Sequence, residues 1–263
     1  MTVLYMYAFL QIIFEALPVS SSGNLLVWIP LLQNLFGLTF YQSKLPDFDF
    51  LLYIPTFFVL AVFFFKEWVV YLCSFSYYKR RLYYLGLSCG LADLCTTIFY
   101  FFIKDRVAAH FPLALGFLCT TVLLFSLRWC KTRDQKSPVL SLKDGALLGI
   151  IQGVAVLPGI SRLASTFVGG VWLGYSYEQA LRYSFLIHIP LMACAIFKAC
   201  ISTFGYQADF FLLDRYFYMI LLIASGIAFW FLHCLLGMVK RRSVWKFGWY
   251  TGLLSLLAAY ASW

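Results

Sequence analysis

Long apolar runs recur along the chain and constrain its fold more than any other feature. Six such runs are residues 50–65, 82–103, 111–129, 180–201, 216–238 and 247–263. Most of them approach the ~20 apolar residues that an α-helix needs to cross the hydrocarbon core of a bilayer. None shows the alternation that a membrane β-barrel requires. The runs predict an all-α integral membrane protein, with residues 1–263 as a single integral domain.

The composition supports this class. Hydrophobic residues make up 63% of the chain and charged residues only 12%, whereas soluble domains carry about 25% charged residues. The formal net charge of +9 would also suit a nucleic-acid-binding protein. The basic residues are concentrated in short loops between the runs, however, as the positive-inside rule predicts. We therefore expect no nucleic-acid partner. The N-terminus lacks the basic region of a cleavable signal peptide, so none is expected either.

Three basic clusters orient the apolar runs. They lie at residues 79–81, 128–143 and 240–246. Lysine and arginine beside membrane spans are retained in the cytoplasm, so we assign these clusters to the cytoplasmic side. The intervening loops carry less net positive charge and are assigned to the outside; they lie near residues 47–49, 104–110 and 205–214. With these assignments, the runs predict six transmembrane helices of alternating direction.

Two further apolar stretches are interrupted by helix-breaking residues. Residues 4–35 contain PVSSSGN at 18–24, and residues 142–173 contain PGISR at 158–162. Proline removes an amide donor and hinders helix continuation, and glycine adds backbone freedom. We interpret each stretch as a re-entrant helical hairpin, the first with both ends outside and the second with both ends in the cytoplasm.

Each predicted hairpin is followed by three spans, which gives an inverted-topology repeat of residues 1–130 and 141–263. The sequence similarity between the repeats is weak. Each tip has a Leu-Pro pair, and a glutamine lies about two turns before it, Gln11 in the first repeat and Gln152 in the second. Transporters build midplane sites from such paired broken helices. Irregular backbone at that depth must face protein or a wet cavity, so we expect the two tips to face one another.

The first tip carries residues suited to anion chemistry. Gln11 and Glu15 are four positions apart and share one helix face. Serines at 20–22 and Gly23 follow, and we expect a new helix to open at about residues 24–26. Serine is a favoured N-cap, and a helix N-terminus presents free amides to an anion.

The second tip adds a positive charge. Ser161 and Arg162 lie where another helix is expected to begin. Arginine at this depth is costly unless it is paired or faces water, and its planar fork suits phosphate oxygens. The combined carboxylate, hydroxyls, helix N-termini and guanidinium match the needs of phosphoryl transfer. The alternative is structural: the serines cap a hairpin, and Glu15 pairs with Arg162 as a buried strut.

These motifs resemble the undecaprenyl-diphosphate phosphatase family of bacterial cell-wall enzymes, the bacitracin-resistance type. Residues 11–24, QIIFEALPVSSSGN, are similar to the family's (E/Q)xxxE segment running into FLPxSSxGH. Residues 158–166, PGISRLAST, are similar to its PGxSRSGxT signature. Residues 180–190, ALRYSFLIHIP, resemble AxxFSFLLxIP, and the resemblance extends to residues 240–252. It therefore spans essentially the whole chain.

The resemblance implies hydrolysis of undecaprenyl (polyprenyl) diphosphate to the monophosphate and inorganic phosphate, which recycles the cell-wall lipid carrier. It implies a multi-pass protein of the bacterial inner membrane, with its site opening to the periplasm. It also implies a divalent cation, magnesium or calcium. The implied partners are the diphosphate lipid and the bilayer, and both a monomer and a homodimer are compatible with it.

By position, the resemblance also implies site residues. Glu15 would hold the metal or act as a base, Ser21 would be a nucleophile or phosphate ligand, and Arg162 would clamp the diphosphate. The implied substrate-binding residues are Gln11, Ser20, Ser22, Gly23, Asn24, Gly159 and Ser161.

The chain departs from the family pattern at two places. Asn24 stands where the family has histidine, and Leu163-Ala164 replaces a Ser-Gly pair. Asparagine donates hydrogen bonds but cannot shuttle a proton near neutral pH. His188, inside the 180–201 run, is a candidate replacement acid–base group if it faces the site. The alternative is a neutral histidine bonded to a neighbouring carbonyl.

Two rival functions remain open at this point. Paired broken helices are also a transporter scaffold, so a polyprenyl-phosphate transporter or flippase is the first rival. Because Asn24 replaces the histidine, a catalytically weakened, lipid-binding homologue is the second. Asp93, an acid within the 82–103 run, is a further functional candidate by its depth alone.

Overall fold

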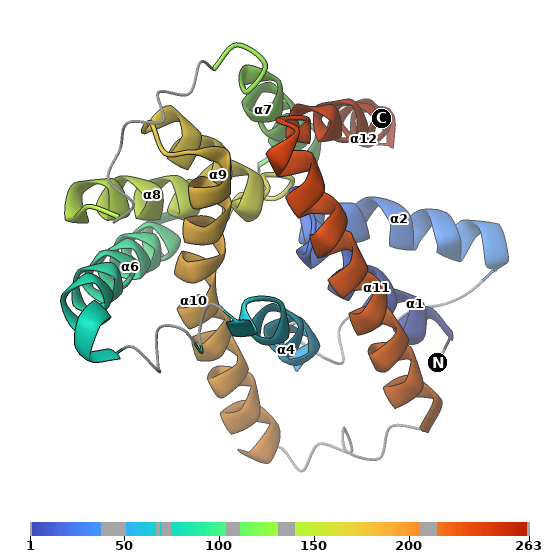
Figure 1. Ribbon diagram of the computed structural model, residues 1–263. Coiled ribbons are helices and arrows are strands. Elements are labelled where there is room, and N and C mark those ends of the chain that lie inside the picture. The colour runs from blue at the N-terminus through green and yellow to red at the C-terminus, as the bar shows by residue number, and fades with distance from the viewer. Residues whose placement is uncertain are drawn as a thin grey trace.

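The computed structural model describes residues 2–37, 51–66, 69, 75–103, 111–130, 140–205 and 215–261. Within these ranges every regular element is a helix (Figure 1), which supports the predicted all-α class. The elements are α1 (Thr2–Glu15), α2 (Ser21–Phe36), α4 (Tyr53–Phe63), α6 (Phe75–Ile103), α7 (Leu113–Ser126), α8 (Leu142–Val154), α9 (Arg162–Trp172), α10 (Tyr177–Gly205), α11 (Arg215–Lys240), η4 (Val244–Lys246) and α12 (Phe247–Ala261).

Three helices in the described ranges are long and apolar enough to cross a membrane. They are Leu82–Phe102 within α6, Tyr177–Ile201 within α10, and Arg215–Lys240, which is α11. The other three predicted spans form shorter helices: α4 has 11 residues, α7 has 14 and α12 has 15. At 1.5 Å per residue, α4 covers about 17 Å, well short of a hydrocarbon core of about 30 Å. The helices thus support a membrane-integral protein, with full-length helices at three of the six predicted positions.

Both interrupted stretches break where the sequence predicts. The first break, residues 16–20, separates α1 from α2, and the second, residues 155–161, separates α8 from α9. Each following helix is capped by a serine, because Ser20 Oγ accepts from Gly23 N at 3.2 Å and Ser161 Oγ accepts from Ala164 N at 3.2 Å.

The first break is shorter than expected. We predicted a helix start at about residues 24–26, but α2 begins at Ser21. The reason lies at Ser20, whose extended backbone (φ −72°, ψ 107°) makes it the cap. The following serines therefore lie in the first turn of α2, where their backbone amides are among the unpaired donors of the helix end.

The first turn of α2 lies against the second break, so the two predicted tips meet, and glycines permit the close approach. A Cβ built on Gly23 would lie only 3.0 Å from the Cα of Gly159. Gly159 itself has φ +84°, a left-handed conformation that favours glycine. A Cβ on Gly116 of α7 would lie 1.9 Å from the carbonyl oxygen of Pro158. Helix α7 therefore packs its backbone directly onto the second break.

A threonine on α7 fixes the second break further. Thr120 Oγ1 donates to the carbonyl of Gly159 at 2.9 Å and accepts from the amide of Ser161 at 3.0 Å. These bonds satisfy two buried backbone groups that a broken helix would otherwise leave without partners. They also set where α9 begins, and hence where its first residue, Arg162, is placed.

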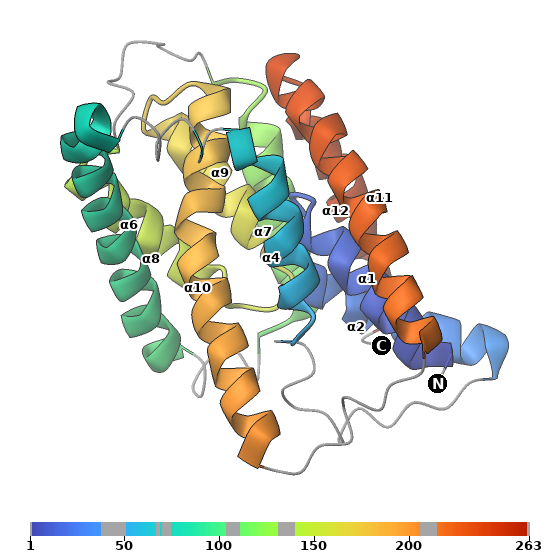
Figure 2. The same ribbon diagram turned by 60° about the horizontal axis from the view of Figure 1, so that its bottom comes forward.

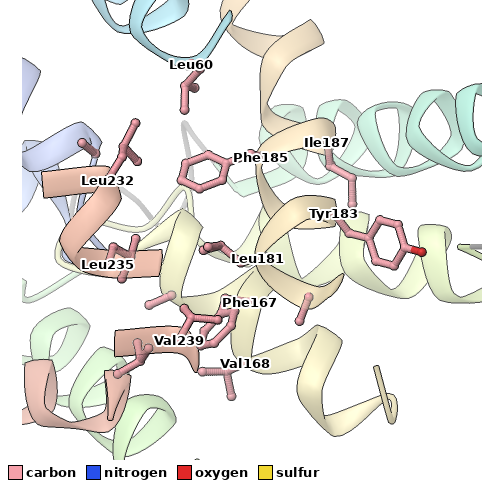
Figure 3. Close-up of a cluster of buried hydrophobic side chains, with 14 of the residues drawn as sticks. Leu60, Phe167, Val168, Leu181, Tyr183, Phe185, Ile187, Leu232, Leu235 and Val239 are labelled. Carbon is pink, nitrogen blue, oxygen red and sulfur yellow. The ribbon is translucent and has the colours of Figure 1, made fainter. Parts of the chain in front are cut away.

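The helix pairs are enclosed by helices from the other half of the chain. Helix α1 packs on α11, α8 packs on α6, and α7 packs on α12. In Figure 2, α6, α10, α4 and α11 run side by side across the molecule. The largest buried cluster joins α4, α9, α10 and α11, and Figure 3 labels its members Leu60, Phe167, Val168, Leu181, Tyr183, Phe185, Ile187, Leu232, Leu235 and Val239. This cluster holds α10, which carries His188, against the second helix pair.

Candidate active site

The carboxylate of Glu15, at the end of α1, is the centre of a buried polar cluster. Its Oε2 accepts from Ser21 Oγ at 2.5 Å. Its Oε1 lies 3.1 Å from Arg162 Nη2 and 3.0 Å from His188 Nε2. The Glu15 side chain is only 6% exposed, so the guanidinium offsets much of the cost of burying its charge. The structure therefore brings together Glu15, the serine turn and Arg162.

Arg162 is held by a second partner that the motifs did not reveal. Its Nη2 donates to the hydroxyl of Tyr53 at 2.8 Å, and its Cζ lies 5.7 Å from the centre of the Tyr53 ring. A guanidinium over an aromatic face gains a cation–π interaction. Tyr53 is one of 18 tyrosines and no local pattern distinguishes it, so sequence alone offered no signal for its role.

His188 contacts Glu15 rather than the backbone carbonyl of the alternative interpretation. In a neutral imidazole, a nitrogen that bonds a carboxylate carries the proton and the other nitrogen keeps a lone pair. Nε2 makes the bond to Glu15. Nδ1 is buried and has no hydrogen-bond partner among the described residues. The Glu15–His188 pair thus resembles the carboxylate–histidine pairs in which the acid orients the imidazole for proton transfer.

These groups line a small cavity. It has a volume of about 40 Å³, which is room for a few water molecules. Glu15, Ser21, Arg162 and His188 line it together with Ser20, Ser22, Gln152, Thr166 and Ser184. The first residues of α2 and α9 both belong to this wall, so the positive ends of two helices open on the cavity. Such an arrangement favours a bound anion.

Asn24 does not line the cavity. It is completely buried, its Nδ2 donates to the carbonyl of Ser20 at 2.8 Å, and its Oδ1 accepts from the hydroxyl of Tyr250. Trp28 Nε1 donates to the same hydroxyl at 3.2 Å. Asn24 thus joins the start of α2 to α12, and its amide is used in holding the turn.

Four other predicted binding residues also lie outside the cavity wall. Gly23 and Gly159 form the contact between the first turn of α2 and the second break, and Ser161 caps α9. Gln11 is 4% exposed, and its Oε1 has no partner among the described residues. Of the predicted set, the cavity therefore brings together Glu15, the three serines, Arg162 and His188, while Gln152, Thr166 and Ser184 were not predicted.

The described residues do not fit a metal site built by the protein alone. They contain no group of three histidine, cysteine, aspartate or glutamate side chains placed to hold an ion. Glu15 is the only acid of the described cavity wall, and a cation at its Oε1 would lie beside the Arg162 guanidinium. Magnesium is often held largely by substrate phosphates. A divalent cation bound with the diphosphate therefore remains a prediction, and no step below depends on it.

The fold and the cluster define a helical membrane protein with a buried polar cluster between two broken helix pairs. The chain belongs to the family described as bacitracin resistance protein BacA, whose model matches residues 4–257. This confirms the family expected from the motifs.

Curated relatives are similar over most of their length. The undecaprenyl-diphosphatase of Desulforapulum autotrophicum is 29% identical, with 96% of each chain covered. The undecaprenyl-diphosphatase of Pelotomaculum thermopropionicum is 32% identical, covering 70% of this chain and 69% of its own. That of Alkaliphilus metalliredigens is 28% identical, with 90% of each chain covered.

Proposed function

We propose that this protein hydrolyses undecaprenyl diphosphate to the monophosphate and inorganic phosphate, and so recycles the cell-wall lipid carrier. The observation that carries the proposal is the Glu15 carboxylate, bonded at once to Ser21, Arg162 and His188 at the meeting point of two helix N-termini. Membership of the BacA family and the names of the curated relatives support the same substrate.

Arg162 and the N-termini of α2 and α9 bind the terminal phosphate. Only 30% of the Arg162 side chain is exposed, and the guanidinium borders the cavity. Its remaining donors and the first amides of α2 and α9 offer hydrogen bonds to the non-bridging oxygens. Fixed donors in a site that excludes bulk water stabilise the charge that develops in the transition state. The apolar tail stays in the lipid phase.

Proton transfer falls to Glu15 and His188. In the reaction an oxygen nucleophile forms a bond to the terminal phosphorus, and the bond to the bridging oxygen breaks, releasing the lipid monophosphate. Two nucleophiles suit the geometry. Ser21 donates its proton to Glu15 Oε2 and would give a phosphoserine that water then hydrolyses. Alternatively, a water in the cavity, activated by the Glu15 carboxylate, attacks directly.

The orientation in the membrane is part of the proposal. We place the first helix pair as a hairpin entered from the periplasm and the second as one entered from the cytoplasm of the inner membrane, with six spans around them. Two contacts between basic clusters and aromatic residues support one cytoplasmic end: Arg128 lies 5.4 Å from the Trp245 ring, and Arg242 lies 5.6 Å from the Tyr177 ring. In Figure 2 the start of α10 and the end of α11 lie at that same end.

One observation favours a second candidate, a polyprenyl-phosphate flippase. The packing is symmetric between the halves, because α1 packs on α11 just as α8 packs on α6. Inverted repeats of this kind move substrates by rocking one half against the other. In that case the cluster would bind the lipid phosphate without cleaving it.

Phosphate release from undecaprenyl diphosphate by the purified protein in detergent distinguishes the phosphatase from the flippase. We expect release by the wild type and at least 100-fold less by Arg162→Ala, because the group that neutralises the phosphate is gone. The assay is run with and without magnesium. Absence of release in both conditions, together with transport of the monophosphate by protein in vesicles, would instead support the flippase.

A further inference from the structure

Gln152 is a polar residue of the cavity wall that has no role in the reaction described above. Gln152 lies on α8, two residues before the helix ends, and it is 1% exposed. Gln152 is one of the residues that line the cavity. Its Nε2 is buried and has no hydrogen-bond partner among the described residues. Buried amide nitrogens are nearly always bonded, and leaving one unpaired costs free energy. A buried donor without a protein partner, on a residue that borders a cavity, suggests that a bound ligand supplies the partner.

The surroundings of Gln152 select the kind of ligand. An amide nitrogen only donates hydrogen bonds, so the partner must be an acceptor. The same wall holds the Arg162 guanidinium and the N-termini of α2 and α9, all of which favour negative charge. Glu15 belongs to this wall too, but its oxygens already accept from Ser21, Arg162 and His188. Phosphate oxygens are acceptors that carry the negative charge that the guanidinium and the helix N-termini favour.

We infer that Gln152 is a substrate-binding residue whose Nε2 donates to a non-bridging oxygen of the diphosphate. The inference rests on the proposed function for the identity of the substrate. It gives the second helix pair two ligands for the phosphates: Gln152 from α8, before the break, and Arg162 from α9, after it. The first pair supplies the serines of the cavity wall, so the substrate is held from both halves of the chain.

Binding of inorganic pyrophosphate tests this inference without requiring turnover. The thermal unfolding temperature of the purified protein in detergent is measured against pyrophosphate concentration, which gives an apparent Kd. We expect Gln152→Leu to weaken binding about 10-fold or more, because a hydrogen bond to a charged group is lost. Without pyrophosphate its unfolding temperature should equal or exceed that of the wild type, because an unpaired buried amide has been removed. Gln152→Glu should weaken binding further, because its carboxylate repels the anion.

Two variants calibrate the result. Arg162→Ala must also weaken pyrophosphate binding, which shows that the probe occupies this cavity. Ser165→Ala is the matched control: Ser165 is buried on the same helix pair, its Oγ also lacks a partner among the described residues, and it does not line the cavity. Its apparent Kd should equal that of the wild type.

The outcomes separate this inference from the proposed function. Equal apparent Kd values for Gln152→Leu and the wild type would overturn the inference. So would a wild type that pyrophosphate does not stabilise. In either case the hydrogen-bond partner of Nε2 would be water and not the substrate. A wild type that binds pyrophosphate through Gln152 but releases no phosphate from the lipid would leave the inference standing and overturn the proposed function.

Discussion

At the scale of single residues, the site is organised around one carboxylate that accepts from three different helices. The motifs made the meeting of Glu15 and Arg162 predictable, because a buried arginine needs a counter-charge. The role of Tyr53 was not predictable, because a tyrosine inside an apolar run has no local pattern and its role depends on which distant helix packs beside it. Gln152 was recognisable as the counterpart of Gln11 in the second repeat, but that correspondence assigned it no role. Asn24 shows the converse, since its place in a motif suggested substrate binding while its contacts hold a turn.

The hydroxyl of Tyr53 should matter for catalysis because it fixes the guanidinium. We expect Tyr53→Phe to lower kcat/KM by about 10- to 100-fold, the range for losing one hydrogen bond to a charged group. The retained ring keeps its contact with Arg162 and should preserve the fold. Steady-state phosphate release measures the effect, and Tyr260→Phe, at an 85% exposed position, is the control. Equal losses in both variants would contradict the role given to Tyr53.

Asn24→His should not raise the rate of phosphate release. Asn24 is fully enclosed and bonded to Ser20 and Tyr250, so a larger imidazole would strain the start of α2 without reaching the cavity. We expect the same rate or a lower one, with a lowered unfolding temperature. A large gain in rate at unchanged stability would mean that the residue at this position reaches the substrate after all.

At the scale of elements, the two helix breaks position the site residues, and the sequence predicted them better than it predicted the helix bounds. Both breaks were predictable, because proline and glycine interrupt otherwise apolar stretches, and the serine before Arg162 was recognisable as a cap. The start of α2 was misplaced because three consecutive serines are equally good caps in sequence terms. The backbone of Ser20 decides among them, and that depends on the packing of the break against Gly159 and α7.

Gly116→Ala tests the packing of α7 on the second break. The added Cβ would lie 1.9 Å from the carbonyl oxygen of Pro158, so the break must shift and carry Arg162 with it. We expect a loss of stability of about 1–3 kcal/mol, as for overpacked cores, together with reduced phosphate release. Gly90→Ala on α6 is the control, because a Cβ there meets nothing within 4 Å. Thermal unfolding and activity that are the same in the two variants would contradict this packing.

At the scale of the whole molecule, the all-helical membrane class followed from the apolar runs, but the pairing of helices did not. Sequence periodicity says nothing about α1 packing on α11 or α8 on α6, because these contacts join opposite halves of the chain. Nor did the length of a run give the length of its helix, as α4 and α7 show. The loops expected near residues 47–49, 104–110 and 205–214 lie outside the described residues except for Gly205, and so does most of the cluster at 128–143.

The proposed orientation predicts that both chain termini are periplasmic. Figure 2 places the N and C markers together, at the end of the molecule opposite the end of α11. In a bacterial host, alkaline phosphatase fused to the C-terminus should therefore be active and green fluorescent protein fused there should be dark. A fusion after Lys240, which belongs to the basic cluster, should give the reverse. Fluorescence from the C-terminal fusion would contradict the orientation.

The central claim is that residues from two separate helix pairs act on one phosphate as a single unit. Its most direct test is a double-mutant cycle on phosphate release from undecaprenyl diphosphate, with Glu15→Gln, Arg162→Gln and the combined variant. Residues that act as a unit are strongly non-additive, so we predict that the double variant loses about as much rate as either single variant. Losses that multiply, or a single variant with wild-type turnover, would contradict the claim.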